Sequence, residues 1–526
     1  MIMKANSGRN MRPVSAILTG LAAATFATSS AQAESAGSAV TLLGEPHLNI
    51  LPRTEAEEAR IAPVIAPADQ FAAPENFETR AGGGTTKFNN QTRDAFSFAS
   101  SNMAFSSEMD FKVGNGFFKK LWVTAPASTV SSDGLGPIYN ARACQRCHIK
   151  DGRGHTPQNA EDTGVSMFMR ISVPKDVSDL SEDLLAYMAN APEPNYGTQI
   201  QDKSIAGHSI EARMQIDYTP LPVTLGDGSV ITLRAPAYSL SDLGYGALHP
   251  QAQLSPRVSP QMIGLGLLEA VREADILAIA DPGDTDGDGI SGRPNRVWSG
   301  LYDQWMLGRF GLKAGAATIQ EQSMGAFAGD MGLSNPLHPA GSGECTALQT
   351  DCLDAPDGNT PSQGDLEVSE QVMDLVTFYA RNLAVPARRD EDDAKVLRGK
   401  EMFYASGCTS CHTPKYVTHR LADRPEQSFQ LIWPYTDMLL HDMGPGLADN
   451  RPEWQADGQE WRTAPLWGIG MTETVSGHTE FLHDGRAQSL LEAVLWHGGE
   501  AEAAKETVRL MPADDRAALI AFLESL

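Results

Sequence analysis

The clearest hydrophobic patterns in the chain are helical and lie in its second half. A helix predicted over residues 366–382 carries on one face Val372, Leu375, Val376 and Tyr379. Another helical pattern covers residues 262–280. Close to the C-terminus, two more helical faces are formed by Val396, Gly399 and Phe403, and by Leu519, Phe522, Leu523 and Leu526. Because Gly399 is small, we expect these last two helices to cross closely there.

Residues 165–250 have a different pattern. Short β-branched runs, such as 231–233, stand between glycine and proline signals, so we predict a small β-rich insertion. Further along, Ser489 and Glu492 match a capping box, and Gly498 and Gly499 can end the helix that begins there. The apolar face of this helix holds Leu490, Ala493, Val494 and His497.

The composition is that of a globular chain with an acidic surface. Of 526 residues, 41% are hydrophobic and 20% charged, which allows at least one large core. The formal net charge is −25, from 41 Lys and Arg against 66 Asp and Glu. Nucleic acids and anionic membranes require clustered cations, so we expect neither as a partner, and a charged macromolecular partner should be basic.

The first 33 residues have the features of a secretory signal. Lys4, Arg9 and Arg12 form a positive region, residues 14–26 form a short apolar segment, and Ala31-Gln32-Ala33 offers a cleavage site. The alternative, a membrane anchor, needs about 20 apolar residues. We therefore expect an exported, periplasmic protein without a membrane span in its mature chain, with an N-terminal extension over residues 34–80.

Four of the six cysteines lie in two copies of the pattern C-x-x-C-H. The copies are Cys144-Gln145-Arg146-Cys147-His148 and Cys408-Thr409-Ser410-Cys411-His412. Thiols at this spacing reach both vinyl groups of one haem, and the adjacent imidazole binds the iron. A zinc site would need neither histidine, and a thioredoxin-like dithiol would not explain the repeated histidine. We predict two covalently attached haem c groups, with His148 and His412 as proximal iron ligands.

Three other features suggest ligands or cross-links. His497, on its apolar helix face, is the expected sixth ligand of the second haem, and a core or capping histidine is the alternative. Cys345 and Cys352 lie in a polar segment and most simply form a local disulfide. The carboxylates of a calcium loop, D-x-D-x-D-G, are matched by Asp284, Asp286 and Asp288, although position twelve is Asn295 and a solvated acidic turn is the alternative.

Several ordered motifs resemble those of the di-haem c-type oxidoreductases, peroxidase-like proteins that are also called thiol oxidoreductases and are related to bacterial di-haem cytochrome c peroxidases. The resemblance covers about residues 81–526. It is carried by DGLGPIYNARACQRCH, SPRVSPQMIGLGLLEA, DTDGDGISGRPNRVW, GDMG, LAVPARR, GCTSCH, LLHDMG, WRTAPLWGIG and FLHDGRAQSLLEAVLWHGGE.

This resemblance implies roles for particular residues. In the related peroxidases, a helix after an H-D-G turn supplies the distal ligand of the C-terminal haem, and His497 matches that position. Residues 308–332 resemble the peroxidase distal loop, so Gln322 would orient peroxide and Asp330 would act as acid and base, with Glu321 as the fallback; helix capping is the structural alternative for all three. No distal ligand is evident for the first haem, so we expect its sixth position to be open.

Four further residues are suggested by their type and position. Trp298 and Trp305 could form an aromatic bridge between the haems, although core packing explains either equally well. Arg142 and Arg486 could pair with haem propionates, since guanidinium matches carboxylate geometry, and surface arginines are the alternative.

The expected fold is mainly α, with two cytochrome c-like haem domains, the small β-rich insertion and long loops. The first haem domain should span residues 81–385 and the second 386–526. We expect a small redox protein, such as a basic cytochrome, to donate electrons at the second haem, and peroxide or a related small oxidant to be reduced at the first. The alternatives are a non-enzymatic electron carrier with two six-coordinate haems and a di-haem oxygenase or protein-modifying enzyme.

Overall fold

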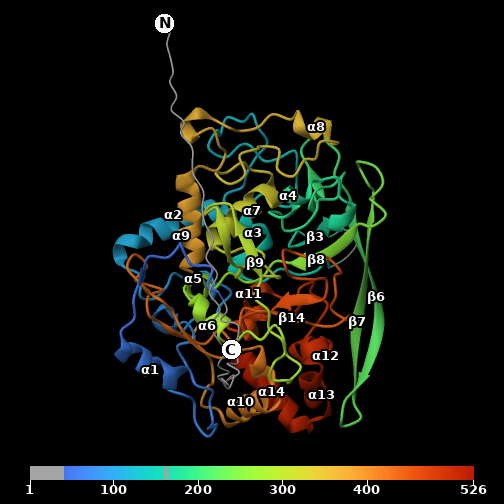
Figure 1. Ribbon diagram of the computed structural model, residues 1–526. Coiled ribbons are helices and arrows are strands. Elements are labelled where there is room, and N and C mark those ends of the chain that lie inside the picture. The colour runs from blue at the N-terminus through green and yellow to red at the C-terminus, as the bar shows by residue number, and fades with distance from the viewer. Residues whose placement is uncertain (1–40, 159–161, 163–164) are drawn as a thin grey trace, which may run out of the picture. The chain divides into compact units, whose positions relative to one another are not determined.

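Short helices and strands are separated by long irregular segments in this chain (Figure 1). The structure is a computed structural model that describes residues 41–158, 162 and 165–526. The predicted signal over residues 1–33 lies outside the described residues. Residues 42–526 form one compact unit, and the two haem domains remain a prediction.

The helices are α1 (Glu55–Ile65), α2 (Glu108–Lys119), α3 (Cys144–Cys147), α4 (Glu182–Leu185), α5 (Leu265–Glu269), α6 (Glu273–Leu277), α7 (Ile319–Met331), α8 (Thr350–Leu353), α9 (Glu370–Arg381), α10 (Ala394–Ala405), α11 (Thr472–Ser476), α12 (Leu490–Trp496), α13 (Glu502–Leu510) and α14 (Ala513–Ser525). The pattern over 366–382 therefore matches α9. The pattern over 262–280 corresponds to two short helices, α5 and α6, rather than to one long helix.

The strands are β1 (Ile50–Leu51), β2 (Ile138–Tyr139), β3 (Met167–Ser172), β4 (Gln199–Ile200), β5 (Lys203–Ser204), β6 (Arg213–Thr224), β7 (Val230–Ser241), β8 (Gln253–Val258), β9 (Arg296–Ser299), β10 (Gln304–Leu307), β11 (Tyr416–Val417), β12 (Arg420–Leu421), β13 (Leu431–Ile432), β14 (Leu440–Asp442) and β15 (Glu460–Arg462). Six two-stranded sheets and one three-stranded sheet, of order β4-β3-β8, result among the described residues. Residues 165–250 contain β3 to β7, in agreement with the predicted β-rich insertion.

The expectation of a mainly α fold is wrong. Helices make up 29% of the chain and strands 17%, spread over many small sheets. The 48 glycines and 32 prolines keep the helices short, because both residue types disfavour a helix interior. Strands of two to four residues are too short to show a period-two pattern, so most of them could not be recognised in the sequence.

Helix packing brings together segments that are distant in sequence. The C-terminal helix α14 packs on α10, and α9 packs on both α2 and α7. A side chain at Gly399 would place its Cβ 1.9 Å from the Ala518 carbonyl oxygen, so only glycine allows this crossing of α10 and α14. The predicted close crossing is therefore confirmed.

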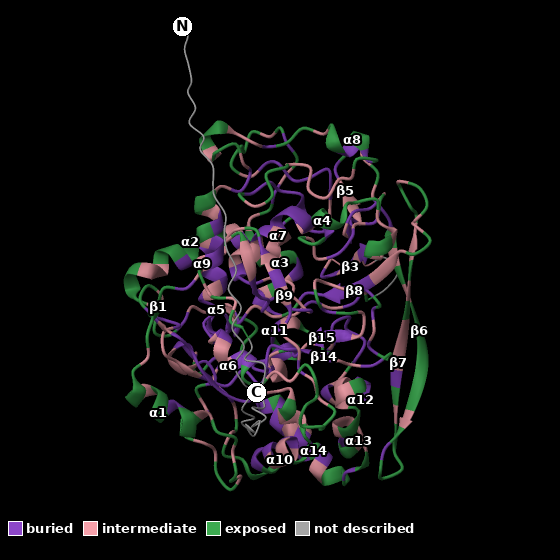
Figure 2. Ribbon diagram, in the orientation of Figure 1, coloured by how far each residue is buried: buried purple, intermediate pink, exposed green. Residues whose placement is uncertain are grey.

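The hairpin β6–β7 runs along one side of the compact unit, from the region of α8 and β3 toward α12 and α13 (Figure 1). It is mostly exposed or half-buried (Figure 2). Its strand β6 carries Pro220 and Pro222, which cannot donate to a further strand. This composition protects an exposed edge from pairing with another chain.

Residues of the predicted N-terminal extension are part of the compact unit. Strand β1 pairs with β12 in antiparallel register. The Glu45 carboxylate binds Arg309 at 2.6 Å and His419 at 2.7 Å. Among the described residues, no helix has both the length and the apolar character that crossing a bilayer requires.

Candidate haem sites

The first C-x-x-C-H pattern forms helix α3 and the turn after it. Cys144 and Cys147 are free thiols, and Cys144 lies against an apolar cluster that includes Phe118, Trp122 and Met331. The imidazole Nδ1 of His148 donates to the Pro260 carbonyl at 2.8 Å. Burial lowers the pKa of His148 to about 4 although this bond opposes the shift, so the ring is neutral and its Nε2 is left for a metal ion.

The second pattern follows α10 and has the same arrangement. Cys408 and Cys411 are free thiols, and Cys408 lies against a cluster that contains Phe403, Trp433 and Trp496. His412 donates Nδ1 to the Tyr435 carbonyl at 2.9 Å. Burial lowers the pKa of His412 to about 4, although the bond to Tyr435 opposes the shift. Cys408, of the same pattern, and Trp496, next to His497, belong to one apolar cluster.

His497 lies directly after α12, whose first turn is capped as the sequence predicts. Ser489 Oγ accepts a hydrogen bond from the Glu492 N–H at 3.1 Å, whereas the Glu492 carboxylate accepts from the N–H of Gln488 instead of closing the box on Ser489. His497 donates Nδ1 to the Ala493 carbonyl at 2.7 Å, and burial lowers its pKa. This ring too is neutral with Nε2 left for a metal ion.

These groups suit haem ligation. All three histidines have Nδ1 fixed by a main-chain carbonyl, which is the support that metal-bound imidazoles usually have. Each ring remains half-buried by accessible area, although burial is the main cause of its low pKa. The residues present therefore fit two haems, one at each pattern.

His441 is unsuited to iron ligation although it lies beside Cys411, at 3.5 Å. Its Nε2 binds Asp437 at 2.7 Å and its Nδ1 binds Glu500 at 2.6 Å. Burial opposes protonation, but hydrogen bonds to Asp437, Cys411 and Glu500 raise the pKa of His441 to about 12. Both nitrogens carry protons, so neither has a lone pair for iron.

Asp330 lies at the first site, near the end of α7. Its main-chain oxygen accepts hydrogen bonds from the N–H groups of Asn140 and Ala141, at 2.9 and 3.0 Å. Burial raises the pKa of Asp330 despite a hydrogen bond from Gln199. Burial is also the main reason that the pKa of Cys144 is raised to about 12, and the Asp330 charge raises it further. The same two causes act on Cys147.

A contact between two glycines holds the end of α7 at this site. A Cβ at Gly136 would lie 2.6 Å from the Cα of Gly332, the left-handed residue that ends α7. These glycines belong to the segments DGLG and GDMG, which are distant in sequence. Only residues without side chains permit this approach, so the contact explains both motifs.

Glu321 and Gln322 are not brought together with Asp330. They lie eight or nine residues earlier on α7, which is about 12 Å along a helix axis. Glu321 accepts hydrogen bonds from Ser299 Oγ at 2.7 Å and from Thr318 Oγ1 at 3.2 Å, in the first turn of α7. Gln322 is exposed. Thr318 is the residue that caps α7, since its Oγ1 accepts the Glu321 N–H at 3.1 Å.

A buried glutamine that sequence reasoning missed contacts Asp330 instead. Gln199 comes from β4, more than a hundred residues earlier, and donates Nε2 to Asp330 Oδ1 at 2.8 Å. Glutamine in a short strand carries no local signal of this contact, so only the tertiary structure could identify it.

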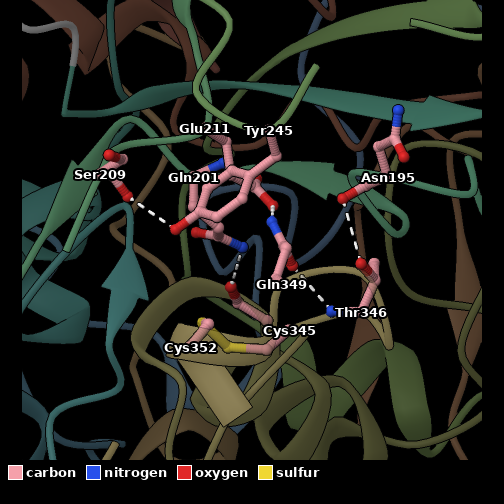
Figure 3. Close-up of a disulfide and its surroundings, with 10 residues drawn as sticks. Asn195, Gln201, Ser209, Glu211, Tyr245, Cys345, Thr346, Gln349 and Cys352 are labelled. Atoms are coloured by element: carbon pink, nitrogen blue, oxygen red, sulfur yellow. Dashed lines mark hydrogen bonds between the residues drawn. A yellow bond between two sulfur atoms is a disulfide. The ribbon is translucent and has the colours of Figure 1, made fainter. Parts of the chain in front are cut away.

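Cys345 and Cys352 form the predicted disulfide, with Cα atoms 5.9 Å apart (Figure 3). Next to it, Gln349 donates Nε2 to Glu211 at 2.6 Å, and Glu211 accepts the Gln201 N–H at 2.6 Å. Gln201 in turn donates Nε2 to the Gly329 carbonyl at 2.7 Å. The disulfide loop is thus connected to the last turn of α7, which carries Asp330.

The acidic loop brings its three carboxylates together. Ligand atoms of Asp284, Asp286 and Asp288 all lie within 4.8 Å of one another on the surface. Asn295 is not part of this group, because its amide is buried and bound to Lys313, Glu453 and Gln455. Just after the loop, Ser291 Oγ donates to Glu500 at 2.5 Å, the carboxylate that also binds His441.

The aromatic and basic residues singled out in the sequence have other partners. Trp298 and Trp305 form a cluster with Tyr187 and Trp454, at centroid distances of 4.7 to 6.2 Å. Arg486 is buried and already binds the Asp484 carboxylate at 2.7 Å. Arg142 is exposed and donates Nε to the Trp122 carbonyl.

Comparison with known proteins gives one extensive match. A family model described as "Di-haem oxidoreductase, putative peroxidase" matches residues 76–526. A search of the curated proteins finds no match. Among solved structures, a chain of "Kuenenia stuttgartiensis Hydrazine Synthase Pressurized with 20 bar Xenon" is 16% identical, with a TM-score of 0.22, over 31% of this chain. This chain spans 57% of that chain's length. Because the family model covers nearly the whole described chain, the protein belongs to the di-haem oxidoreductases.

Proposed function

We propose that the protein is an exported, periplasmic c-type enzyme of this family that reduces peroxide or a related small oxidant. Cys144 and Cys147 would bind one haem covalently, and Cys408 and Cys411 the other. His148 and His412 would be the proximal ligands, and His497 the sixth ligand at the second site. When bound, the haems supply the electron storage and the open iron site that peroxide reduction requires. A small redox protein would supply the electrons.

The observation that carries this proposal is the difference between the two sites. At the second site, His412 and His497 both have Nδ1 fixed by a main-chain carbonyl, and Cys408 and Trp496 beside them belong to one apolar cluster. At the first, a carboxylic acid lies beside the haem pattern instead, since the main-chain oxygen of Asp330 accepts hydrogen bonds from Asn140 and Ala141, just before Cys144. Two histidines favour electron transfer, whereas one histidine and an acid favour chemistry on a small ligand.

Asp330 would move the proton that cleavage of an O–O bond requires. Its Oδ1 accepts the hydrogen bond from Gln199, which leaves Oδ2 to hold or release a proton. Burial raises its pKa, which favours the protonated form that an acid catalyst requires.

The test is peroxide-dependent oxidation of a reduced basic cytochrome by the haem-loaded protein, with the spin state of each iron recorded. We expect one high-spin and one low-spin iron. His148→Ala and Asp330→Asn should lower turnover at least a hundredfold, whereas Gln322→Ala should not change it. Two low-spin irons without a peroxide response would instead identify an electron carrier.

A second set of variants tests the ligand at the second site. His497→Ala should preserve both haem attachments but change the second haem's spectrum. His478→Ala is the matched control, because His478 already uses Nε2 toward Arg153 and Nδ1 toward Glu480. Equal spectra for wild type and His497→Ala would contradict the assignment.

The three aspartates of the acidic loop would bind calcium. The bound ion would affect the architecture of the protein rather than its catalysis. This part of the proposal is supported by the convergence of three carboxylates and by Gly287 and Gly289, which adopt positive φ in the same loop. Through Ser291 and Glu500, an ion bound there would order the segment next to His497.

A further inference from the structure

Three buried cations share two carboxylates in the interior of the compact unit. The side chains of Lys313, Arg257 and Arg451 are 0%, 7% and 1% exposed. Asp449 binds Lys313 at 2.8 Å, and Glu453 binds Arg257 at 2.7 Å and Arg451 at 3.3 Å. Among the described residues, no other carboxylate forms an ion pair with any of these cations. The cluster therefore carries a surplus of at least one positive charge.

The contacts show that this surplus is a real charge. Lys313 Nζ donates to Asp449 at 2.8 Å and to the Arg451 and Asp457 carbonyls at 2.9 and 2.6 Å, which uses all three hydrogens of an ammonium group. Burial favours the neutral form of Glu453, but the charges of both arginines lower its pKa to about 2. Even with both carboxylates ionised, one cation has no counter-ion.

One N–H group of the cluster also has no acceptor. Arg451 donates Nη2 to the Ile171 carbonyl at 3.5 Å and contacts Glu453 with Nη1, whereas its Nε is buried without a partner among the described residues. Burial is the main reason that the pKa of Arg451 is lowered to about 9, and the charge of Arg257 lowers it further. A water molecule could accept from Nε, but only an anion also neutralises the surplus charge.

Strand β8 connects the cluster to the first haem pattern. Arg257 lies in this largely buried strand (Figure 2). Two residues later, Ser259 Oγ donates to the Cys147 carbonyl at 2.7 Å, and the next carbonyl, of Pro260, accepts Nδ1 of His148 at 2.8 Å. Arg257 is therefore within three residues of both contacts.

Trp461 connects the cluster to the second haem pattern. Lys313 Nζ and Arg257 Cζ lie 4.6 and 5.8 Å from the centroid of its six-membered or five-membered ring system. Trp461 packs in the apolar cluster that also contains Cys408. The surplus cation thus adjoins residues of both haem sites, where the propionate groups of a haem are the anions expected.

We propose that Arg451, Arg257 and Lys313 form the binding site of a haem propionate. This inference rests on the part of the proposed function that places a haem at each C-x-x-C-H pattern. Guanidinium groups match carboxylate geometry, and the two arginines that the sequence suggests for this role are exposed or already bound to Asp484. Arg451 Nε donates to a propionate oxygen. The surplus charge also favours the reduced haem, which is the more negative form, and so raises its reduction potential.

The direct test is a crystal structure of the haem-loaded protein. We expect a propionate oxygen within hydrogen-bond distance of Arg451 Nε. A water molecule or an inorganic anion at this atom, with all propionates elsewhere, would overturn the inference.

A spectroelectrochemical titration tests the effect on potential and identifies the haem concerned. Arg451→Gln should shift the one-electron reduction equilibrium of one haem about tenfold toward the oxidised form, which is about 59 mV. Arg451→Lys keeps the charge and should restore most of this shift. Arg398→Gln on α10 is the matched control, because it removes an exposed charge, and should shift neither haem more than twofold. An effect of Arg451→Gln no larger than that of the control would overturn the inference.

The same samples separate this inference from the proposed function. Mature protein without two haems would overturn both. Protein that carries two haems but does not reduce peroxide would overturn the proposed function alone, because the propionate contact and the potentials are measured without peroxide. If Arg451→Gln does not yield haem-loaded protein, the wild-type crystal structure and Arg451→Lys still decide the inference.

Discussion

At the scale of single residues, the same device recurs at His148, His412 and His497. Each ring donates Nδ1 to a main-chain carbonyl and is kept neutral by burial. The carbonyl fixes the tautomer, and the neutral ring offers its Nε2 lone pair. His441 shows the opposite case, since two carboxylates keep it protonated.

His47 provides a test of how burial affects the pKa of a histidine for which burial is the largest cause of the shift. Both of its ring nitrogens are buried without a hydrogen-bond partner among the described residues, and burial lowers its pKa from 6.5 to about 4. Between these pH values the unfolded chain binds a proton that the folded protein does not. The contribution of neutral, buried His47 to the free energy of unfolding is therefore fully present above pH 6.5 and is lost as the pH falls toward 4.

We expect His47→Phe to reduce this loss by about 2 kcal/mol at pH 5. The measurement is the free energy of unfolding in urea at pH 5.0 and at pH 7.5. The value at pH 7.5 is the internal control, because both states are then neutral and only packing differs. An equal pH dependence in wild type and variant would contradict the assigned burial of the ring.

The residue scale also shows what the sequence could and could not predict. The spacing of C-x-x-C-H identifies the thiols and their histidines, because it is local. The carbonyls of Pro260 and Tyr435 and the amide of Gln199 come from distant segments, and no pattern links them to the sites. For the same reason, the resemblance groups Gln322 and Glu321 with Asp330 at one site, although the length of α7 separates them from it.

At the scale of elements, the crossing of α10 and α14 positions the second site. Helix α10 leads directly into Cys408, and Phe403 on α10 contacts both His412 and Phe522 of α14, with centroid distances of 6.2 and 5.1 Å. Gly399 permits the crossing. The helical faces were predictable here because each helix spans twelve or more residues.

Gly399→Ala should destabilise this region by about 1–3 kcal/mol, since the new Cβ would collide with a main-chain oxygen. Gly116→Ala in α2 is the matched control, because no atom lies within 4 Å of its Cβ position. That control should gain up to about 1 kcal/mol from helix propensity. The measurement is the thermal unfolding midpoint of each variant. Equal midpoints for Gly399→Ala and Gly116→Ala would contradict the close crossing of α10 and α14.

The acidic loop is an element that should respond to calcium. We expect added Ca²⁺ to raise the unfolding temperature, with a stabilisation of about 2.7 kcal/mol when its concentration is one hundred times Kd. Asp286→Asn combined with Asp288→Asn should remove the effect, while Asp217→Asn, an exposed carboxylate on β6, should preserve it. A calcium response that survives the double variant would place the ion elsewhere.

Strands were the least predictable elements. Strands of two residues, such as β4, form because loops meet in the folded protein and not because of a local preference. The hairpin β6–β7 is the exception, since twelve residues in each strand gave a recognisable β-branched pattern. This difference in length explains why the strand content of residues 165–250 could be predicted and the fold class could not.

At the scale of the whole molecule, the net charge of −25 should favour encounters with the basic donor protein that we propose. A cationic donor is attracted over a distance that salt shortens, so raising ionic strength should slow its association by at least tenfold. Stopped-flow oxidation of a reduced basic cytochrome measures this rate. An acidic cytochrome is the control and should associate faster as salt is added. A rate for the basic donor that does not depend on salt would contradict electrostatic steering.

The whole account depends on two haems held covalently by four cysteines. Intact-mass measurement of the mature, exported protein tests this most directly, combined with peptide mapping of Cys144, Cys147, Cys408 and Cys411. We predict the mass of the processed polypeptide plus two haem groups, one on each C-x-x-C-H peptide. The mass of the polypeptide alone, with all four thiols unmodified, would contradict it.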